Sequence, residues 1–219
     1  MLAEPAPGCE LCPRLVQFRH ENREDHPDFH NAPVASFGPQ NARLLIVGLA
    51  PGLKGANRTG RPFTGDFAGD LLYPTLIKFG FARGSFDRRP DDGLKLSGCR
   101  ITNAVRCVPP QNKPTTIEIR TCNRFLASEL TSLPRLRAVL ALGGIAHGAV
   151  LSALGQRKSA RKFAHGAVHE VPGGPKGPLT LADSYHCSRY NTNTGRLTQE
   201  MFETVIAGLK ARLDQAGSF

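Results

Sequence analysis

Four of the six cysteines are spaced so that they could hold a metal centre. Cys9 and Cys12 form a close pair near the N-terminus, whereas Cys107 and Cys122 lie far along the chain. Four thiolates suit either a zinc ion or a 4Fe–4S cluster, and a split set without a compact knuckle slightly favours the cluster. The alternative is that the two later cysteines are ordinary buried thiols. No ligand role is evident for the remaining pair, Cys99 and Cys187.

A long glycine-rich loop that begins at Gly48 carries groups suited to binding a nucleotide. It lacks the Walker A sequence, because arginine and proline stand where lysine and then serine or threonine are required. The spaced glycines of dinucleotide-binding folds are absent too, so we expect no nucleotide cofactor. Two arginines for anionic oxygens, an aromatic ring and a carboxylate remain: Arg58, Arg61, Phe63 and Asp66. The competing interpretation is a solvated surface turn.

A polar loop late in the chain places His186 just past an apolar segment, where an imidazole could take part in catalysis. The chain has seven histidines, and any one of them is more often structural than catalytic. Neither the His-Glu-x-x-His pattern of zinc proteases nor the paired motifs of zinc deaminases occur. His186 is therefore a candidate that needs partners from elsewhere in the fold.

The charge balance favours a polyanionic partner. Lys and Arg total 28 against 18 Asp and Glu, a formal charge of +10, although the basic residues are spread along the chain. No apolar stretch is long enough for a membrane span, and the N-terminus does not resemble a signal peptide. Six unevenly spaced cysteines argue against a disulfide framework. We expect a cytoplasmic protein with no membrane partner.

Strand-like apolar segments alternate with helical patterns along the chain. The expected strands are 43–49, 99–105, 136–142 and 179–182, and the clearest helical stretches are 71–77, one that opens with a capping box at 115–118, and 197–213. Parallel strands need crossover helices that cover both faces of their sheet. The alternation therefore predicts an α/β fold, a single three-layer α/β/α domain over 1–219 with a mostly parallel four-stranded central sheet. Residues 1–40 are expected to form an N-terminal segment that carries Cys9 and Cys12.

Four unusual loops each follow the carboxyl end of an expected strand. They span 51–69, 103–114, 143–147 and 183–196. Open α/β sheets bind their ligands at this edge. We therefore expect four segments that are distant in sequence to converge on one site.

The order and wording of these segments resemble the family 5, or type b, uracil-DNA glycosylases over nearly the whole chain. The shared strings are Gly-Leu-Ala-Pro-Gly at 48–52, Gly-Ala-Asn-Arg-Thr-Gly-Arg-Pro-Phe-Thr-Gly-Asp at 55–66, Ile-Thr-Asn at 101–103 and Asn-Thr-x-Thr-Gly-Arg-Leu-Thr at 191–198. The resemblance implies an enzyme that excises uracil and other deaminated bases, with DNA containing such a base as its partner. It also implies a 4Fe–4S cluster rather than zinc, with its ligands at Cys9, Cys12, Cys107 and Cys122.

The resemblance further implies a role for each residue of the pocket. The base, extruded from the duplex, would stack on Phe63, and the Asn103 amide would read its edge. His186 would stabilise negative charge on the departing base, and Asp66 would position water or stabilise an oxocarbenium-like sugar. Tyr190 is the expected wedge that fills the emptied stack. The remaining expected substrate-binding residues are Ala50, Gly52, Asn57, Arg58, Arg61, Ser188 and Arg189.

This chain departs from the family pattern at three places. It reads His-Cys-Ser at 186–188 where the family usually reads His-Pro-Ser, so this loop is expected to be less rigid. Related families place a polar or acidic residue shortly after Gly48, where this chain has Leu-Ala at 49–50, so the catalytic role falls to Asp66. Uracil-only relatives exclude substituents on the base with a tyrosine, and the matching Gly52 predicts a wider pocket.

Two other classes of protein remain as alternatives. One is a non-catalytic nucleic-acid-binding protein that carries an Fe–S cluster or zinc, and the other is a redox protein whose four cysteines carry the function. Neither makes use of the loops around Asp66 and His186. The expected cluster is structural, because hydrolysis of a glycosidic bond transfers no electrons, and a monomer is expected.

Overall fold

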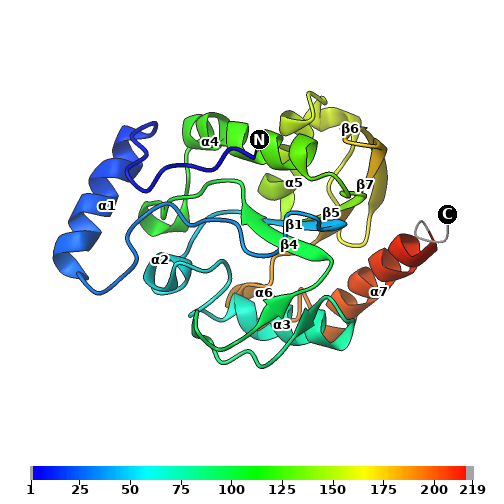
Figure 1. Ribbon diagram of the computed structural model, residues 1–219, viewed down its shortest axis with the longest axis horizontal. Helices are drawn as coiled ribbons and strands as arrows, with labels where there is room; N and C mark the ends of the chain where they lie inside the picture. Colours follow the sequence, from blue (N-terminus) through cyan, green and yellow to red (C-terminus); the bar gives the residue numbers. More distant parts are fainter. Residues whose placement is uncertain (1, 216–219) are drawn as a thin grey trace.

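A five-stranded sheet forms the centre of the protein, whose computed structural model describes residues 2–215 (Figure 1). In spatial order the strands are β4 (Cys99–Asn103), β1 (Leu44–Gly48), β5 (Ala138–Leu142), β7 (Gly177–Ser184) and β6 (Val168–Gly174). The first four are parallel, and β6 runs antiparallel to β7 at the edge. A separate antiparallel pair consists of β2 (Ala82–Arg83) and β3 (Lys95–Leu96).

Helices connect the strands and cover the sheet. The α-helices within the described residues are α1 (Pro13–Asp25), α2 (Ala56–Thr59), α3 (Ala68–Lys78), α4 (Thr116–Ser132), α5 (Gly144–Ala153), α6 (Arg189–Asn193) and α7 (Gln199–Gln215). Two short 3-10 helices are η1 (Pro110–Asn112) and η2 (Lys158–Ala160). Between residues 2 and 215, no helix combines the length and the apolar character needed to cross a lipid bilayer.

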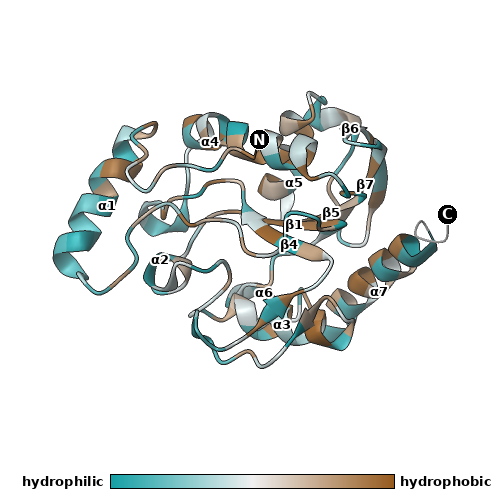
Figure 2. Ribbon diagram, in the orientation of Figure 1, coloured by the Kyte–Doolittle hydropathy of each residue, from teal (hydrophilic) through white to brown (hydrophobic). Residues whose placement is uncertain are grey.

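Alternate residues of β1 enter two separate hydrophobic cores, because successive side chains of a strand point to opposite faces of the sheet. Leu44 and Ile46 pack in the core that α3 and α7 cover, whereas Leu45 and Val47 pack in the core that α4 and α5 cover. Figure 1 shows these helix pairs on opposite sides of the sheet, and Figure 2 shows the central strands largely hydrophobic and α1 mostly hydrophilic. The predicted three-layer, mostly parallel architecture is confirmed.

The expected number of four strands is wrong, because β6 adds a fifth. Only Val171 of β6 is buried, and Pro172 and two glycines follow it. A largely exposed edge strand of this composition has no apolar run to reveal it. Its pairing with β7 comes from the tight hairpin between Gly174 and Gly177.

The capping box expected at the start of α4 is present. The Thr115 hydroxyl accepts a hydrogen bond from the Glu118 N–H at 3.3 Å, and the Glu118 carboxylate accepts one from the Thr115 N–H at 2.7 Å. Glu118 also pairs with Arg14 of α1 at 2.7 Å. The cap therefore joins α4 to the N-terminal helix, which lies apart from the sheet in Figure 1.

Buried ion pairs hold the N-terminal segment against the edge of the sheet. Glu4 pairs with Arg100 at 3.0 Å and with Arg106 at 2.9 Å. Both arginines also reach the fully buried Glu129 of α4, at 2.8 and 2.7 Å. The backbones of Phe37 and of Ile101 in β4 also form an isolated antiparallel β-bridge. These contacts bring the N-terminal cysteine pair close to the segments that follow β4.

Candidate active site

A pocket lies beyond the carboxyl ends of β1, β4 and β7, where three loops meet. The chain passes from β1 to β4 on one side and then to β5 on the other. The pocket therefore lies close to the point where the strand order reverses, which is where open α/β sheets bind ligands. Its walls are formed by Ala50, Pro51, Gly52, Ala56, Phe63, Asp66, Ala68, Asn103 and His186.

Of the four loops expected to converge, the segment 143–147 does not line this pocket. Its backbone supports the site instead, since the Gly143 N–H donates to the Ser184 carbonyl oxygen at 2.8 Å, and α5 begins at Gly144. The expectation of a four-loop site is therefore wrong, and the loops after β1, β4 and β7 form the pocket.

The glycines of the loop after β1 let polar groups approach its backbone closely. A Cβ atom at Gly48 would lie 2.6 Å from the Phe63 ring and would overlap the Asn103 amide oxygen. A Cβ atom at Gly55 would overlap the Asp66 carboxylate, and one at Gly52 would lie 3.1 Å from its Oδ2. The glycine-rich sequence thus makes room for the side chains that form the pocket.

Asp66 has one carboxylate oxygen engaged by the backbone and one directed at the glycines. Its Oδ1 accepts a hydrogen bond from the Ala68 N–H at the start of α3, at 3.2 Å. Burial raises the pKa of Asp66, the hydrogen bond from Ala68 lowers it, and the nearby charge of Asp70 raises it. Asp66 therefore helps to begin a helix and also presents a partly buried carboxylate to the pocket.

His186 and Phe63 stack across the pocket, with ring centroids 5.7 Å apart and an interplanar angle of 29°. Burial lowers the pKa of His186 to about 4, so the imidazole is uncharged at neutral pH. A base between two rings needs them about 7 Å apart, from two contacts of about 3.5 Å each. A base that inserts between Phe63 and His186 would therefore have to separate them, whereas one that slides beside His186 would not.

Asn103, at the end of β4, contributes an unsatisfied polar group to the pocket. Its side chain is 3% exposed, and within residues 2–215 no protein group hydrogen-bonds to its amide oxygen. A buried amide without a partner is costly, and most such groups in proteins are satisfied. This amide is therefore oriented for a ligand that enters the pocket.

A wider groove adjoins the pocket and shares part of its wall, including Ala50, Gly52, Asp66 and His186. The groove adds Ser188 and Arg189 from the loop after β7. The guanidinium of Arg189 lies over the Phe67 ring, 5.3 Å from its centroid, and the residue is exposed. Tyr190 follows and is 70% exposed, a position open to a partner.

The loop that carries His186 has internal supports in place of the missing proline. The Asn191 side-chain amide donates to the His186 carbonyl oxygen at 2.9 Å, and the Ser188 hydroxyl caps α6 by accepting from the Asn191 N–H at 3.4 Å. Cys187 is fully buried in the core beneath α3 and α7. These contacts oppose the loss of rigidity expected from the His-Cys-Ser sequence.

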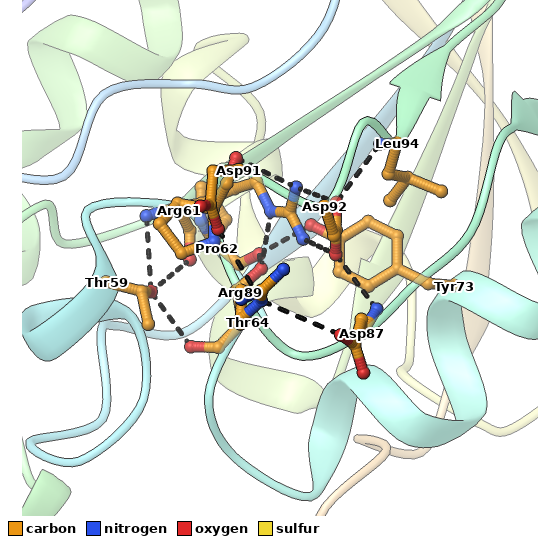
Figure 3. A network of polar contacts seen from close by, with 11 residues as sticks. Thr59, Arg61, Pro62, Thr64, Tyr73, Asp87, Arg89, Asp91, Asp92 and Leu94 are labelled. Carbon is orange, nitrogen blue, oxygen red and sulfur yellow. Dashed lines mark hydrogen bonds and ion pairs between the residues drawn. The ribbon is translucent and has the colours of Figure 1, made fainter.

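The expectation that Arg61 binds anionic oxygens of the substrate is wrong. Figure 3 shows its guanidinium enclosed by protein groups: two nitrogens donate to Asp92 at 2.8 and 2.7 Å, and Nε donates to Thr64 at 2.8 Å. The Arg61 side chain is only 6% exposed, and the ion pair holds the pKa of Asp92 well below its usual range. Arg61 fastens the loop to the segment around Asp92 instead of reaching a ligand.

Asn57 also lies outside the pocket, contrary to expectation, although its buried amide oxygen has no partner among residues 2–215. It is fully buried, lines neither the pocket nor the groove, and donates from its amide to the Asn31 side chain at 2.8 Å. Its backbone N–H donates to the Gly52 carbonyl oxygen at 3.0 Å. The neighbouring Arg58 is exposed and is therefore free to meet an anion at the surface.

Several wall residues of the pocket and groove were not among the expected site residues. Pro51, Ala56 and Ala68 are small or apolar and differ in no visible way from other loop residues. Asn112 lines the groove with a positive φ of 57°, a conformation that asparagine adopts more readily than most residues. Its position in a proline-rich loop after a strand is the only sequence feature that could have suggested it.

The four cysteines that were candidate ligands line a second cavity, between α1, α4 and the segment after β4. Cys12 is the N-cap of α1, and burial raises the pKa of the Cys122 thiol to about 12. The Cys107 sulfur accepts a hydrogen bond from Arg19 at 3.1 Å, and the Cys122 sulfur accepts one from a backbone N–H at 3.3 Å. Cys99 and Cys187 are buried elsewhere, in the core beneath α3 and α7.

Arg19 places a cation in the wall of this second cavity. The residue is 2% exposed, and its Nε has no hydrogen-bond partner within the described part of the chain. Its other nitrogens donate to the Cys107 sulfur and to the Cys9 carbonyl oxygen, and no carboxylate between residues 2 and 215 forms an ion pair with it. A buried guanidinium without a counter-ion fits an anionic group in the cavity.

Comparison with known proteins gives consistent matches. The model of the Uracil DNA glycosylase superfamily matches residues 35–210, a range that includes Asp66, Asn103 and His186. A type-5 uracil-DNA glycosylase of Thermus thermophilus is 49% identical over 208 residues, which cover 93% of each chain. Another from Pyrobaculum aerophilum is 41% identical over 203 residues, 91% of this chain and 86% of that relative. A type-4 uracil-DNA glycosylase of the same organism is 31% identical over 157 residues, 71% of this chain and 66% of that relative.

Proposed function

The chain belongs to the uracil-DNA glycosylase superfamily, within its type-5 members, and on this premise we propose that its pocket hydrolyses the N-glycosidic bond of uracil in DNA. The observation that carries the proposal is the unsatisfied Asn103 amide, which shares one pocket with Phe63, Asp66 and His186. A nucleotide must leave the duplex to reach such a site, at a cost of a few kcal/mol that is lowest for mispaired bases.

Asn103 provides the recognition. Its amide oxygen accepts one hydrogen bond and its amide nitrogen donates others. Uracil presents an N3–H donor beside the O4 acceptor, and hypoxanthine presents N1–H beside O6, so both offer the complementary pair. With no side chain at Gly52 to exclude a larger base, the proposed substrates are uracil and other deaminated bases.

Asp66 and His186 provide the chemistry. As the bond between C1′ and the base breaks, the ionised Asp66 stabilises positive charge on the sugar and accepts a proton from the water that attacks C1′. The departing base takes the bonding electrons, and the neutral His186 stabilises this negative charge by hydrogen bonding. The products are the free base and an abasic site.

The proposed cofactor is a 4Fe–4S cluster held by Cys9, Cys12, Cys107 and Cys122. A tetrahedral zinc site with Zn–S bonds of about 2.3 Å needs sulfur atoms about 3.8 Å apart. Among the described residues no three of these sulfurs lie within 4.8 Å of one another, and Arg19 supplies a buried positive charge for an anionic group. When bound, the cluster would cross-link the N-terminal segment, α4 and the segment after β4.

The proposed setting follows from the same observations. A net charge of +10 and exposed cationic side chains such as Arg58 and Arg189 favour DNA as the partner. None of the six cysteines forms a disulfide within the described residues, which suits the reducing cytoplasm. We propose that the enzyme works there as a monomer.

The activity test uses an oligonucleotide with a single uracil opposite guanine, and the same oligonucleotide with thymine as the control. Alkaline cleavage at an abasic site is expected only with uracil. Asn103→Ala should lower the single-turnover rate, whereas Asn123→Ala, on α4 away from the pocket, should leave it unchanged. Binding to the uracil oligonucleotide without any base release would overturn the proposal.

The cofactor test measures metal content after anaerobic purification. About four iron atoms per chain are expected, and Cys107→Ala should lose them, whereas Cys99→Ala should keep them because Cys99 lies in a different core. Stoichiometric zinc without iron would contradict the cluster without affecting the proposed activity.

A further inference from the structure

Three side chains with nitrogen and oxygen donor atoms meet outside the pocket, at the end of the sheet that carries β6 and β7. His147 lies in the first turns of α5, His169 in β6 and Asp183 near the end of β7. Their donor atoms all lie within 4.8 Å of one another. His147 and Asp183 are buried, and His169 is partly exposed.

The hydrogen bonds of His147 determine which of its nitrogens is free. Its Nε2 lies 2.9 Å from the Arg161 carbonyl oxygen, which can only accept, so Nε2 carries the hydrogen. In a neutral ring Nδ1 then has a lone pair, and it faces the Asp183 Oδ1 at 2.8 Å. Two acceptor atoms at this distance need a positive species between them, either a proton or a metal ion.

The ring orientation of His147 is the one found in metal sites. A histidine that ligates a metal through one nitrogen almost always donates its other N–H to a carboxylate, a carbonyl or water. The Arg161 carbonyl occupies that position, so the Nδ1 lone pair faces the Asp183 carboxylate, and the His169 donor atom lies within 4.8 Å of both.

His169 adds a second, independent indication. Its Nε2 lies 3.4 Å from the Asp183 Oδ2. Both atoms are buried, and inside the 2–215 range neither makes a hydrogen bond of good geometry, although the Ala164 N–H also acts on the Asp183 carboxylate. A proton between His147 and Asp183 leaves His169 and Oδ2 with only this long mutual contact, whereas a metal ion among the three side chains would engage both atoms directly.

We propose that His147, His169 and Asp183 form a binding site for a divalent transition-metal ion, with zinc as the best fit. Two imidazole nitrogens and one carboxylate are donors that zinc accepts, with a fourth position for water. Bonds of about 2.0–2.1 Å place tetrahedral donors about 3.4 Å apart. The 3.4 Å between His169 Nε2 and Asp183 Oδ2 already matches this separation. His147 Nδ1 faces the other carboxylate oxygen, Oδ1, at 2.8 Å, so the carboxylate has to turn for Oδ2 to serve both imidazoles.

Bound there, the ion would tie α5 and the edge strand β6 to the end of β7. Asp183 precedes the catalytic candidate His186 by three residues, and none of the three ligands lines the pocket. The site therefore has a structural role, which is to hold the base of the loop that carries His186.

The test measures zinc binding to the purified protein with its cysteine site loaded, by calorimetry and by zinc content after gel filtration. The wild type should bind one zinc ion more than His169→Ala, and its melting temperature should rise with added zinc. His169→Ala and Asp183→Asn should each weaken binding by at least about tenfold, since even changes to outer-shell partners of a metal cost about 10- to 100-fold.

His165→Ala is the matched control, because this neighbouring histidine accepts from the Tyr185 N–H and is not one of the three ligands. It should bind zinc as the wild type does. Equal zinc content in the wild type and His169→Ala, or a melting temperature indifferent to zinc, would mean that only a proton joins His147 to Asp183 and would overturn the proposal. His169 is partly exposed, so its variant should fold even if Asp183→Asn does not. The readouts do not depend on uracil excision.

Discussion

At the scale of single residues, burial favours the uncharged form of both ionisable groups in the pocket. For His186 this is the form that the proposed chemistry needs. For Asp66 it opposes the required ionisation, but a carboxylate with little water around it also stabilises positive charge on the sugar more strongly than a solvated one. Burial of Asp66 therefore raises its pKa and at the same time strengthens its electrostatic effect on the sugar.

Asp66→Asn should lower the single-turnover rate by about 10²–10³ and leave DNA affinity nearly unchanged, because the charge acts mainly in the transition state. The asparagine oxygen can still accept from the Ala68 N–H, so stability should change by less than about 1 kcal/mol. Asp91→Asn, which loses an exposed pair with Arg89, is the control. A variant of Asp66 that melts early but cleaves at the parental rate would reduce this residue to a structural role.

The pH dependence of the single-turnover rate should show no inflection from His186 near pH 6.5. His186 is neutral above its pKa of about 4, and Asp66 is ionised above a pKa that lies higher than its usual value. The rate should therefore fall as acidification protonates Asp66, and it should do so above the usual range of a carboxyl group. A rate profile from pH 4 to 9 checks this, and an inflection near pH 6.5 that is absent in His186→Ala would show that the histidine titrates normally.

Gly52→Tyr tests the breadth of the pocket, and the structure adds a complication to it. A Cβ atom at this position lies 3.1 Å from the Asp66 Oδ2, so any side chain presses on the carboxylate before a ring excludes a base. Gly52→Ala isolates that pressure and should lower the excision rates of uracil and hypoxanthine equally. Gly52→Tyr should in addition lower the hypoxanthine rate relative to uracil. An unchanged ratio of the two rates would remove Gly52 from the wall that selects the base.

At the scale of the elements, the loop between β1 and α3 depends on its anchoring. The pair of Arg61 with Asp92 is almost completely buried, and the guanidinium lies over the rings of Phe37, Tyr73 and Phe86. Removal of one partner leaves a buried charge without compensation. This ion pair therefore determines where Phe63 and Asp66, a few residues after Arg61, can lie.

Arg61→Ala should lower the free energy of unfolding by about 3–5 kcal/mol, as expected for one half of a buried ion pair. Arg58→Ala, an exposed arginine of the same loop, should change it by less than about 0.5 kcal/mol. Urea unfolding followed by circular dichroism compares the two variants. Equal effects would show that the exposure of these arginines in solution differs from that in the structure.

At the scale of the whole molecule, the net charge of +10 acts through phosphate contacts. Because each neutralised phosphate releases condensed counter-ion, log affinity should fall with log salt by roughly 0.9 per contact on duplex DNA. Arg58→Ala should reduce this slope by about one. Arg212→Ala should leave the slope unchanged, because Arg212 lies near the edge of the sheet opposite the pocket. The carbonyl oxygen of its neighbour Leu213 accepts a hydrogen bond from Arg43, which directly precedes β1. Fluorescence anisotropy at several salt concentrations measures both, and a flat salt response would argue against DNA.

The sequence by itself determined the four parallel strands, the capping box of α4 and the three loops that form the pocket. Each of these depends on short-range patterns, namely apolar periodicity and the residues that end a strand or begin a helix. The positions of the pocket loops followed as well, because the carboxyl ends of parallel strands meet at one edge. The edge strand β6 was not predicted, because only one of its residues, Val171, is buried.

Only the tertiary structure decided which polar side chains of those loops face a ligand. Arg58 and Arg61 are of one type and three residues apart, yet the first is exposed and the second is enclosed by a carboxylate 31 residues away. The same holds for His147, His169 and Asp183, which look unrelated in the sequence and meet only when α5, β6 and β7 pack together. The environment of a charged or ligating group is set by chain segments that are distant in sequence, and no local pattern encodes which segments these are.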